Sequence, residues 1–139
     1  MMINVCIERG YAMIQPVGHY AQTEFAEGLD RALAACPDGC AAGLIMDFRQ
    51  SSGVERHSVV RVRETTRYLV ARADRYRRHI AVIVPNDGVS RIMEIGGAIS
   101  HQQGITYGYC HDVDEAIGWL TVEVARMEAA YSPNQYQGE

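Results

Sequence analysis

Two nearly continuous apolar runs, AGLIMDF at residues 42–48 and HIAVIV at residues 79–84, constrain the fold more than any other feature of this sequence. Apolar runs of this length without polar alternation are typical of strands that are covered on both faces. Between them, residues 59–76 place apolar side chains at helical spacing, with arginines at the intervening positions. A buried strand, an amphipathic helix and a second buried strand predict a parallel βαβ unit.

The flanking segments continue this alternation. Residues 3–8 and 11–17 predict an antiparallel hairpin, because Arg9 and Gly10 separate two short apolar stretches. Helices are predicted over 21–36, from about Ser90 onward and over 112–130, and a last short strand over 106–110. The predicted fold class is α/β, with a mostly parallel sheet of four to five strands, an antiparallel N-terminal edge strand and about four helices.

Each predicted helix has an expected buried stripe. For the helix over 59–76 the stripe begins at Val59 and ends at Tyr76, and for the helix from Ser90 it consists of Ile92, Ile95, Ile99 and neighbouring small residues. Ser90 is expected to cap its helix, and Asp112 with Glu115 forms a capping-box-like start for the last one. These stripes predict how each helix faces the sheet.

The length of 139 residues suits one domain with a single core, which we place at residues 1–131, followed by a polar tail at 132–139. The start has no signal-peptide pattern, and no stretch approaches 18 apolar residues, so we expect a cytoplasmic protein without a membrane span. The four cysteines form no CxxC motif, which favours reduced structural thiols over a disulfide framework.

Charge is distributed unevenly along the chain. The net charge is −4 and all 13 basic residues are arginines, nine of which lie between Arg49 and Arg78. This window contains only three acids, Glu55, Glu64 and Asp74. The pattern predicts a basic face on an acidic body, with Arg61, Arg63 and Arg67 as candidate docking residues on the helix. The acidic total and the lack of lysine favour a protein-docking or solvated face over a nucleic-acid interface.

A functional site is expected where the predicted parallel strands end, because open α/β sheets bind ligands beyond the carboxyl ends of their strands. Three loops, at 47–53, 85–90 and 111–112, reach this edge. The candidate binding or switch residues that they supply are Asp47, Arg49, Ser51, Ser52, Asn86, Asp87 and His111.

Three kinds of chemistry are conceivable for these loops. A serine hydrolase would use Ser52 as nucleophile, His111 as base and Asp112 or Asp87 to orient it, but the sequence contains no GxSxG elbow. A metal site at Cys110, His111 and Asp112 is disfavoured, because three adjacent residues at a strand end cannot all converge on one ion. No P-loop or GxGxxG motif follows a strand. We therefore predict no metal and no cofactor.

Over roughly residues 3–125 the order of elements resembles the SpoIIAA-like group, which comprises STAS domains and related STAS/CRAL-TRIO-like bacterial proteins. The resemblance rests on the strand pair, the strand GLIMDFRQ, the arginine-rich helix, the strand RRHIAVIVPND and the terminal DVDEAIGWL. It implies a four-turn βα superhelix that is often dimeric and usually non-enzymatic. In one branch a serine or threonine at the start of the second helix is phosphorylated to release a kinase-like partner.

Ser51-Ser52-Gly53 falls in the loop of that switch, with Gln50 where the branch has aspartate and a charged Val54-Glu55-Arg56-His57 where it has apolar residues. Ser52 with Glu55 also fits a capping box, and capping is the favoured reading of Ser52. We expect a regulatory module, homodimeric and without enzyme activity, that recognises a protein partner through the strand-end loops. The alternatives are a protein that binds a small anionic molecule or a lipid and, third, a weak serine hydrolase.

Overall fold

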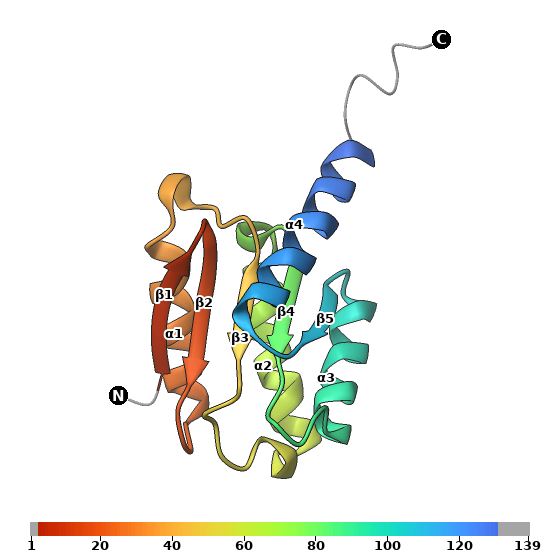
Figure 1. Cartoon of the computed structure of the whole chain (residues 1–139). Coiled ribbons are helices and arrows are strands. Elements are labelled where there is room, and N and C mark those ends of the chain that lie inside the picture. The colour runs from red at the N-terminus through yellow and green to blue at the C-terminus, as the bar shows by residue number, and fades with distance from the viewer. Residues whose placement is uncertain (1–2, 131–139) are drawn as a thin grey trace.

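Residues 3–130 are described by the structure, a computed structural model with one five-stranded sheet between two helical layers (Figure 1). The predicted tail at 132–139 and residue 131 lie outside the described residues. The elements are β1 (Ile3–Glu8), β2 (Tyr11–Pro16), α1 (Gln22–Ala34), β3 (Leu44–Asp47), α2 (Val59–Ala71), β4 (His79–Ile83), α3 (Arg91–Gln102), β5 (Thr106–Cys110) and α4 (Val113–Ala130). Short 3₁₀ helices lie at Pro37–Gly39, Val54–Arg56 and Ala73–Tyr76.

The strands lie in the sheet in the same order as in the chain, β1-β2-β3-β4-β5. β1 pairs antiparallel with β2, and each later strand pairs parallel with the one before it. The predicted fold class is therefore confirmed, including the antiparallel strand at the N-terminal edge. Asn4 lies opposite Gln15 in the hairpin, a register that brings two polar side chains together on one face.

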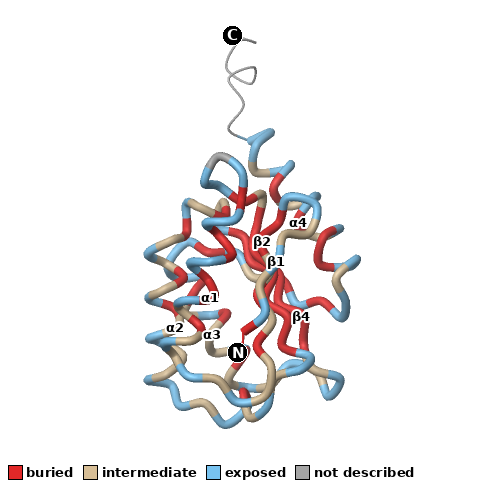
Figure 2. Tube along the Cα trace, turned by 90° about the vertical axis from the view of Figure 1, so that its left-hand side faces the viewer, coloured by how far each residue is buried: buried red, intermediate tan, exposed pale blue. Residues whose placement is uncertain are grey.

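Helices α1, α2 and α3 cover one face of the sheet, and α4 covers the other (Figure 2). Each of the three crossovers steps to the next strand in the same direction, and right-handed crossovers of that kind leave their helices on one side. The larger core lies under these three helices and includes Phe25, Leu44 and Ile80, whereas α4 packs against Ile45 and Ile83.

The face under α4 is only partly covered. Five strands about 4.8 Å apart span roughly 20 Å, whereas one helix is about 10 Å wide. α4 contacts mainly β4 and β5, and Trp119 packs on Gly108. The part of this face on β1 and β2 carries Asn4, which is exposed, and Gln15, which is half-buried, beside Cys6 and Met13. This uncovered part adjoins the end of β3, where the candidate site lies.

The arginine-rich helix is shorter than predicted. We expected one helix over 59–76, but α2 ends at Ala71 and a 3₁₀ turn covers Ala73–Tyr76. Arg72 leaves the helical conformation, with φ at −114°, and Tyr76 is fully buried with its hydroxyl donating to the carbonyl of Leu69. Val59, predicted to be buried, is 42% exposed. Burial of Tyr76 in the core therefore ends the helix early.

The buried side of helix α3 differs in part from the prediction, because it contains small residues but not the three isoleucines. Ile92, Ile95 and Ile99 were expected to face the sheet, but they are only partly buried. The buried residues are Met93, Gly97 and Ser100. A side chain at Gly97 would lie 2.4 Å from the hydroxyl oxygen of Tyr109, so the absence of one lets α3 approach β5 closely. No helix within residues 3–130 is long and apolar enough to cross a membrane.

Candidate functional site

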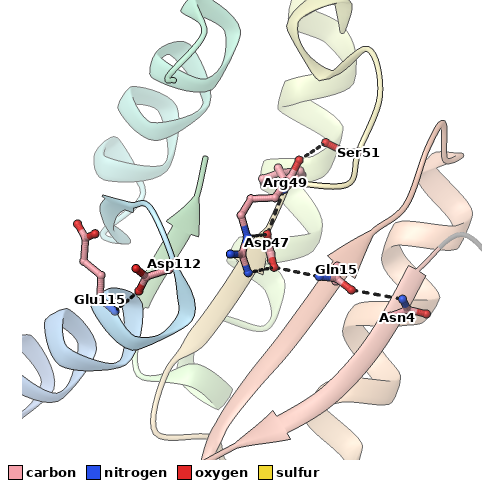
Figure 3. Close-up of polar contacts among 8 residues, drawn as sticks. Asn4, Gln15, Asp47, Arg49, Ser51, Asp112 and Glu115 are labelled. Atoms are coloured by element: carbon pink, nitrogen blue, oxygen red, sulfur yellow. Dashed lines mark hydrogen bonds and ion pairs between the residues drawn. The ribbon is translucent and has the colours of Figure 1, made fainter. Parts of the chain in front are cut away.

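Asp47, the last residue of β3, is the centre of a polar chain at the carboxyl edge of the sheet (Figure 3). Its carboxylate is fully buried and accepts hydrogen bonds from the Arg49 backbone amide (3.0 Å), from Nε (3.0 Å) and Nη2 (2.8 Å) of Arg49, and from the Gln15 amide (3.0 Å). Gln15 in turn accepts a longer bond from Asn4 (3.4 Å). The chain runs across β1, β2 and β3 on the face that α4 leaves open.

The Arg49 guanidinium keeps Asp47 ionised. Burial would by itself raise the pKa of Asp47, but hydrogen bonds from Arg49 and Gln15 and the charge of Arg49 together hold that pKa below its usual range. The hydrogen bond to Asp47 raises the pKa of Arg49, and Asp112 adds to this effect. Arg49, a candidate anion-binding residue, is thus already neutralised by a buried carboxylate.

The loop after β3 is fixed by backbone bonds to the loop after β2. Gly18 donates to the carbonyl of Gln50 (2.8 Å) and accepts from the amide of Ser52 (2.9 Å), which forms a parallel bridge between Gly18 and Ser51. The Ser51 hydroxyl donates to the carbonyl of Phe48 (2.7 Å). Gln50 and Ser52 are exposed, so the loop has a fixed backbone and outward-facing polar side chains.

The prediction that Ser52 caps the second helix is wrong. Gly53 has φ at 77°, in the left-handed region, and starts the 3₁₀ turn Val54–Arg56 without a side-chain cap. Helix α2 starts later, and its cap is Ser58, whose hydroxyl accepts from the amide of Arg61 (3.1 Å). The Ser52 side chain is therefore not used in helix capping.

The other two strand-end loops contribute Asn86, Asp87 and His111, all of them exposed. Asn86 and Asp87 lie in a turn closed by the amide of Gly88 donating to the carbonyl of Pro85 (2.8 Å). Ser90 caps α3 as predicted, accepting from the amide of Met93 (3.3 Å). This turn leaves Asn86 and Asp87 at the surface beside the start of α3.

At the start of α4, Asp112 acts as the predicted cap and accepts from the amide of Glu115 (2.8 Å). The His111 ring lies 3.2 Å from the Glu115 carboxylate, which also accepts from the His111 amide. Both His111 and Asp112 therefore contact Glu115 in the first turn of α4. The hydrolase alternative needs the His111 ring bonded to Ser52 and Asp112 or Asp87 orienting that ring, whereas among the described residues the ring pairs with Glu115 and makes no hydrogen bond to Ser52.

The three predicted docking arginines of α2 separate into two groups. Arg61 turns inward, donates to the backbone carbonyl of Tyr20 and lies 5.1 Å above the Tyr20 ring. Arg63 and Arg67 are exposed and line a groove between α2 and α3. Only Arg63 and Arg67 are exposed at the surface, a distinction from Arg61 that the helical spacing does not reveal.

A small apolar cavity of about 70 Å³ lies under the start of α2, with Tyr20, His57, Val62, Ile92 and Tyr109 among its walls. His57 packs edge-on against Tyr20, with 5.6 Å between the ring centroids. Burial, aided by the charge of Arg61, lowers the pKa of His57 to about 4. Small-molecule sites occupy roughly 300–1,000 Å³, so this cavity holds little more than water. No pattern in the sequence predicts this cavity.

Metal ligation has no cluster to support it in the described part of the chain. Within residues 3–130, no group of three or more histidine, cysteine, aspartate or glutamate residues could hold an ion. Cys110 is a buried free thiol, and burial raises its pKa to about 11.

Comparison with known proteins gives a likeness in fold. No protein-family model and no curated protein matches the sequence. The chain is similar to the crystal structure of an uncharacterised protein from the DUF3478 family with a SpoIIAA-like fold, from Shewanella loihica PV-4. The TM-score is 0.55 and the identity 18%, and the match covers 85% of this chain and 93% of that one. The likeness confirms the SpoIIAA-like fold that the order of elements indicates.

Proposed function

We propose that this chain, with its SpoIIAA-like fold, is a non-enzymatic binding module that recognises a protein partner through the loops at the carboxyl edge of its sheet. The observation that supports this most directly is the loop after β3. Its backbone is tied to Gly18, and Arg49 is tied to Asp47, while Gln50 and Ser52 face outward. A preorganised loop of this kind binds a partner without the entropic cost of ordering itself.

The bonding of the polar side chains also favours binding over catalysis. The Ser51 hydroxyl donates to the Phe48 carbonyl, and the Arg49 guanidinium donates to the Asp47 carboxylate. The His111 ring is paired with the Glu115 carboxylate. A hydrolytic site needs a serine and a base in mutual hydrogen-bond reach. We therefore rank the hydrolase last among the three functions considered.

A ligand-binding function is the second candidate, with a small anionic molecule or a lipid as the ligand. The cavity of about 70 Å³ is well below the size of a typical small-molecule pocket. Native mass spectrometry of freshly purified protein separates the two functions. A stoichiometric co-purified ligand would favour the second candidate, and the same spectrum measures whether the chain is the predicted homodimer.

Regulation of the loop would fall on Ser52. The switch position implied by the resemblance contains two serines, but Ser51 is half-buried and its hydroxyl is bonded, whereas Ser52 is exposed. Phosphorylation there would add up to about two negative charges to the partner-facing surface. Incubation with cognate cell extract and ATP, followed by phosphopeptide mapping, is expected to find phosphate on Ser52. Phosphate only on Ser51, or on neither serine, would contradict this.

The binding function is tested by site-specific photo-crosslinking in the source cells. A photoreactive amino acid at Gln50 is expected to form a discrete adduct with one partner protein, because Gln50 projects from the ordered loop. The matched control carries the same amino acid at Val122, which is 56% exposed on α4. Equal adduct patterns from positions 50 and 122, or none from position 50, would contradict partner binding at this edge.

A further inference from the structure

The nine arginines between Arg49 and Arg78 differ in whether the guanidinium group has a hydrogen-bond or ion-pair partner within the molecule. Seven of them have a partner: Arg49 with Asp47, Arg56 with Glu55, Arg61 with the Tyr20 carbonyl, Arg72 with Asp30, Arg75 with the Gly39 carbonyl, Arg77 with Glu128 and Arg78 with Asp74. Within residues 3–130, the side chains of Arg63 and Arg67 make no hydrogen bond or ion pair. Of these nine side chains, Arg63 and Arg67 are therefore the two without a partner among the described residues.

These two arginines lie four residues apart on α2, so their side chains share one face of the helix. Both line a groove of about 500 Å³ between α2 and α3, referred to below as the arginine groove. Val70 and Ile99 contribute apolar surface to it, and Gln102 and Gln103 contribute amides from the end of α3. No acidic residue lines the groove.

The arginine groove stays open because of how α3 is seated. Met93, Gly97 and Ser100 face the sheet, which leaves Ile99 only partly buried on the side toward α2. Val70 on the opposite wall is also only partly buried. Partly exposed apolar side chains flanked by two unpaired cations form a surface with both an apolar and an electrostatic component.

We propose that the arginine groove binds an acidic amphipathic segment of a protein partner. Two carboxylates of that segment pair with Arg63 and Arg67, and an apolar side chain packs between Val70 and Ile99. The acid nearest in sequence, Glu64, accepts a bond from Gln22 on the α1 side, at 3.3 Å, and so does not occupy the groove. Arginine forks bind carboxylates in a geometry that favours this pairing.

The composition of the groove favours a protein segment over a nucleic acid or a membrane. Nucleic-acid sites combine many phosphate contacts with stacking aromatic side chains, whereas this groove offers two arginines and no aromatic residue among its lining. Stable attachment to an anionic membrane generally requires a larger basic cluster. The apolar walls and the paired charges instead match the anchors of an amphipathic helix.

This inference extends the proposed binding function by naming the chemistry of a partner, but it concerns a different surface. The carboxyl-edge loops precede the first residues of α2 and α3, whereas the arginine groove lies toward the last turns of both helices. The two surfaces share no residue, so each can be changed by substitutions outside the other. Failure of either proposal can therefore be recognised separately.

The test is an NMR titration of the full chain with a synthetic amphipathic peptide of about 16 residues, which has glutamates at every fourth position beside a leucine stripe. We expect amide shifts at the groove residues and not at Gln50 or Ser52. Charge reversal at both arginines, R63E/R67E, is expected to raise the Kd at least about tenfold. R63Q/R67Q gives a second measurement if the reversed variant is less stable.

The matched control is R56E/R91E, which has the same net charge as R63E/R67E. Both of its arginines are exposed, and neither lines the groove, so its affinity is expected to stay within about twofold of wild type. No binding of the acidic peptide to wild type, or equal affinity for R63E/R67E, would overturn the proposal. Groove shifts with oligouridylate or phosphatidylserine vesicles instead, or a dimer that R63E/R67E dissociates, would overturn it too.

Discussion

Arg49 folds back onto Asp47, two residues earlier in the chain, and donates to its carboxylate from the backbone amide and from two guanidinium nitrogens. The carboxylate is fully buried, whereas the Arg49 side chain is 36% exposed. The pair closes the end of β3 and sets the direction in which the next loop leaves the sheet. The pair therefore holds the backbone in place at the carboxyl end of β3, where the candidate loops begin.

Replacing Asp47 by asparagine should destabilise the protein by about 1–2 kcal/mol, because the side chain keeps its shape but loses the charge that accepts from Arg49. Arg49→Ala should cost about 2–3 kcal/mol, since it leaves the buried carboxylate with fewer donors; the partial exposure of Arg49 keeps this below a fully buried pair. Urea unfolding measures both. Asp114→Asn, in an exposed pair with Arg9, is the control and should change stability by less than about 0.5 kcal/mol.

The same carboxylate predicts part of the acid sensitivity. The pKa of Asp47 is depressed in the folded state, so its contribution is fully present above the unfolded value near about 4 and is lost as pH falls through the folded value. Between roughly pH 4 and pH 2, the Tm of Asp47→Asn should therefore fall less steeply than that of wild type. Parallel Tm curves would show that Asp47 is not a source of acid sensitivity.

His57 predicts a second pH dependence at higher pH. Burial and Arg61 lower its pKa to about 4, so the unfolded chain binds a proton first as the pH falls. Stability should be constant above roughly pH 6.5 and decline toward pH 4, by about 1 kcal/mol after allowing for partial exposure of the ring. His57→Gln should remove this decline in thermal melts. An NMR titration that gives an ordinary histidine pKa for His57 would contradict it.

Gly108 and Gly118 form a matched pair for packing on the α4 face. A methyl group on Gly108 would lie 2.5 Å from Cε2 of Trp119, whereas one on Gly118 would meet no atom within 4 Å. Gly108→Ala should destabilise by about 2–3 kcal/mol through overpacking. Gly118→Ala, on an exposed position inside α4, should stabilise by about 0.5–1 kcal/mol through helix propensity. Tryptophan fluorescence during urea unfolding reads out both, and a neutral Gly108→Ala would mean that Trp119 moves aside.

Ser58 and Ser52 test the position of the helix cap. Ser58→Ala should cost about 1 kcal/mol, because the amide of Arg61 loses its acceptor. Ser52→Ala should stay within about 0.5 kcal/mol of wild type, since Ser52 is exposed and precedes a turn that has no side-chain cap. Chemical denaturation measures the stability of both variants. A larger loss of stability for Ser52→Ala than for Ser58→Ala would instead support Ser52 as the helix cap.

The strands were predictable because the strongest patterns in the sequence are the apolar runs. Residues 42–48 and 79–84 contain β3 and β4, and the hairpin at 3–8 and 11–17 matches β1 and β2. Such runs need cover on both faces, and short right-handed connections then leave few possible arrangements. The antiparallel edge strand follows from the two-residue turn at Arg9 and Gly10.

The details that failed depend on tertiary contacts. The helix cap is Ser58 and not the predicted Ser52, because the bridge between Gly18 and Ser51 fixes the loop. No local sequence pattern contains that contact. Helix α3 presents Met93 and Gly97 to the sheet because close approach to Tyr109 on β5 outweighs burial of its isoleucines. Periodicity alone shows an apolar stripe but not which neighbour it will meet.

That the candidate loops lie at the strand ends could be predicted from the sequence, but the contacts among their side chains could not. The pairing of Asp47 with Arg49 depends on a backbone turn that points the arginine back at the strand. The separation of Arg61 from Arg63 and Arg67 depends on where Tyr20 lies, about 40 residues earlier in the chain. Spacing on one helix cannot show which arginines are already engaged.

Because the spatial order of the strands repeats their order in the chain, the sheet can be assembled one strand at a time as the polypeptide leaves the ribosome. Each new strand finds its pairing edge on the one synthesised just before it. The face of the sheet under α4 is covered later, because Ile45, Ala81 and Ile83 pack against α4, which begins only at Val113. A nascent chain that has completed β4 therefore carries an uncovered apolar surface until α4 is made.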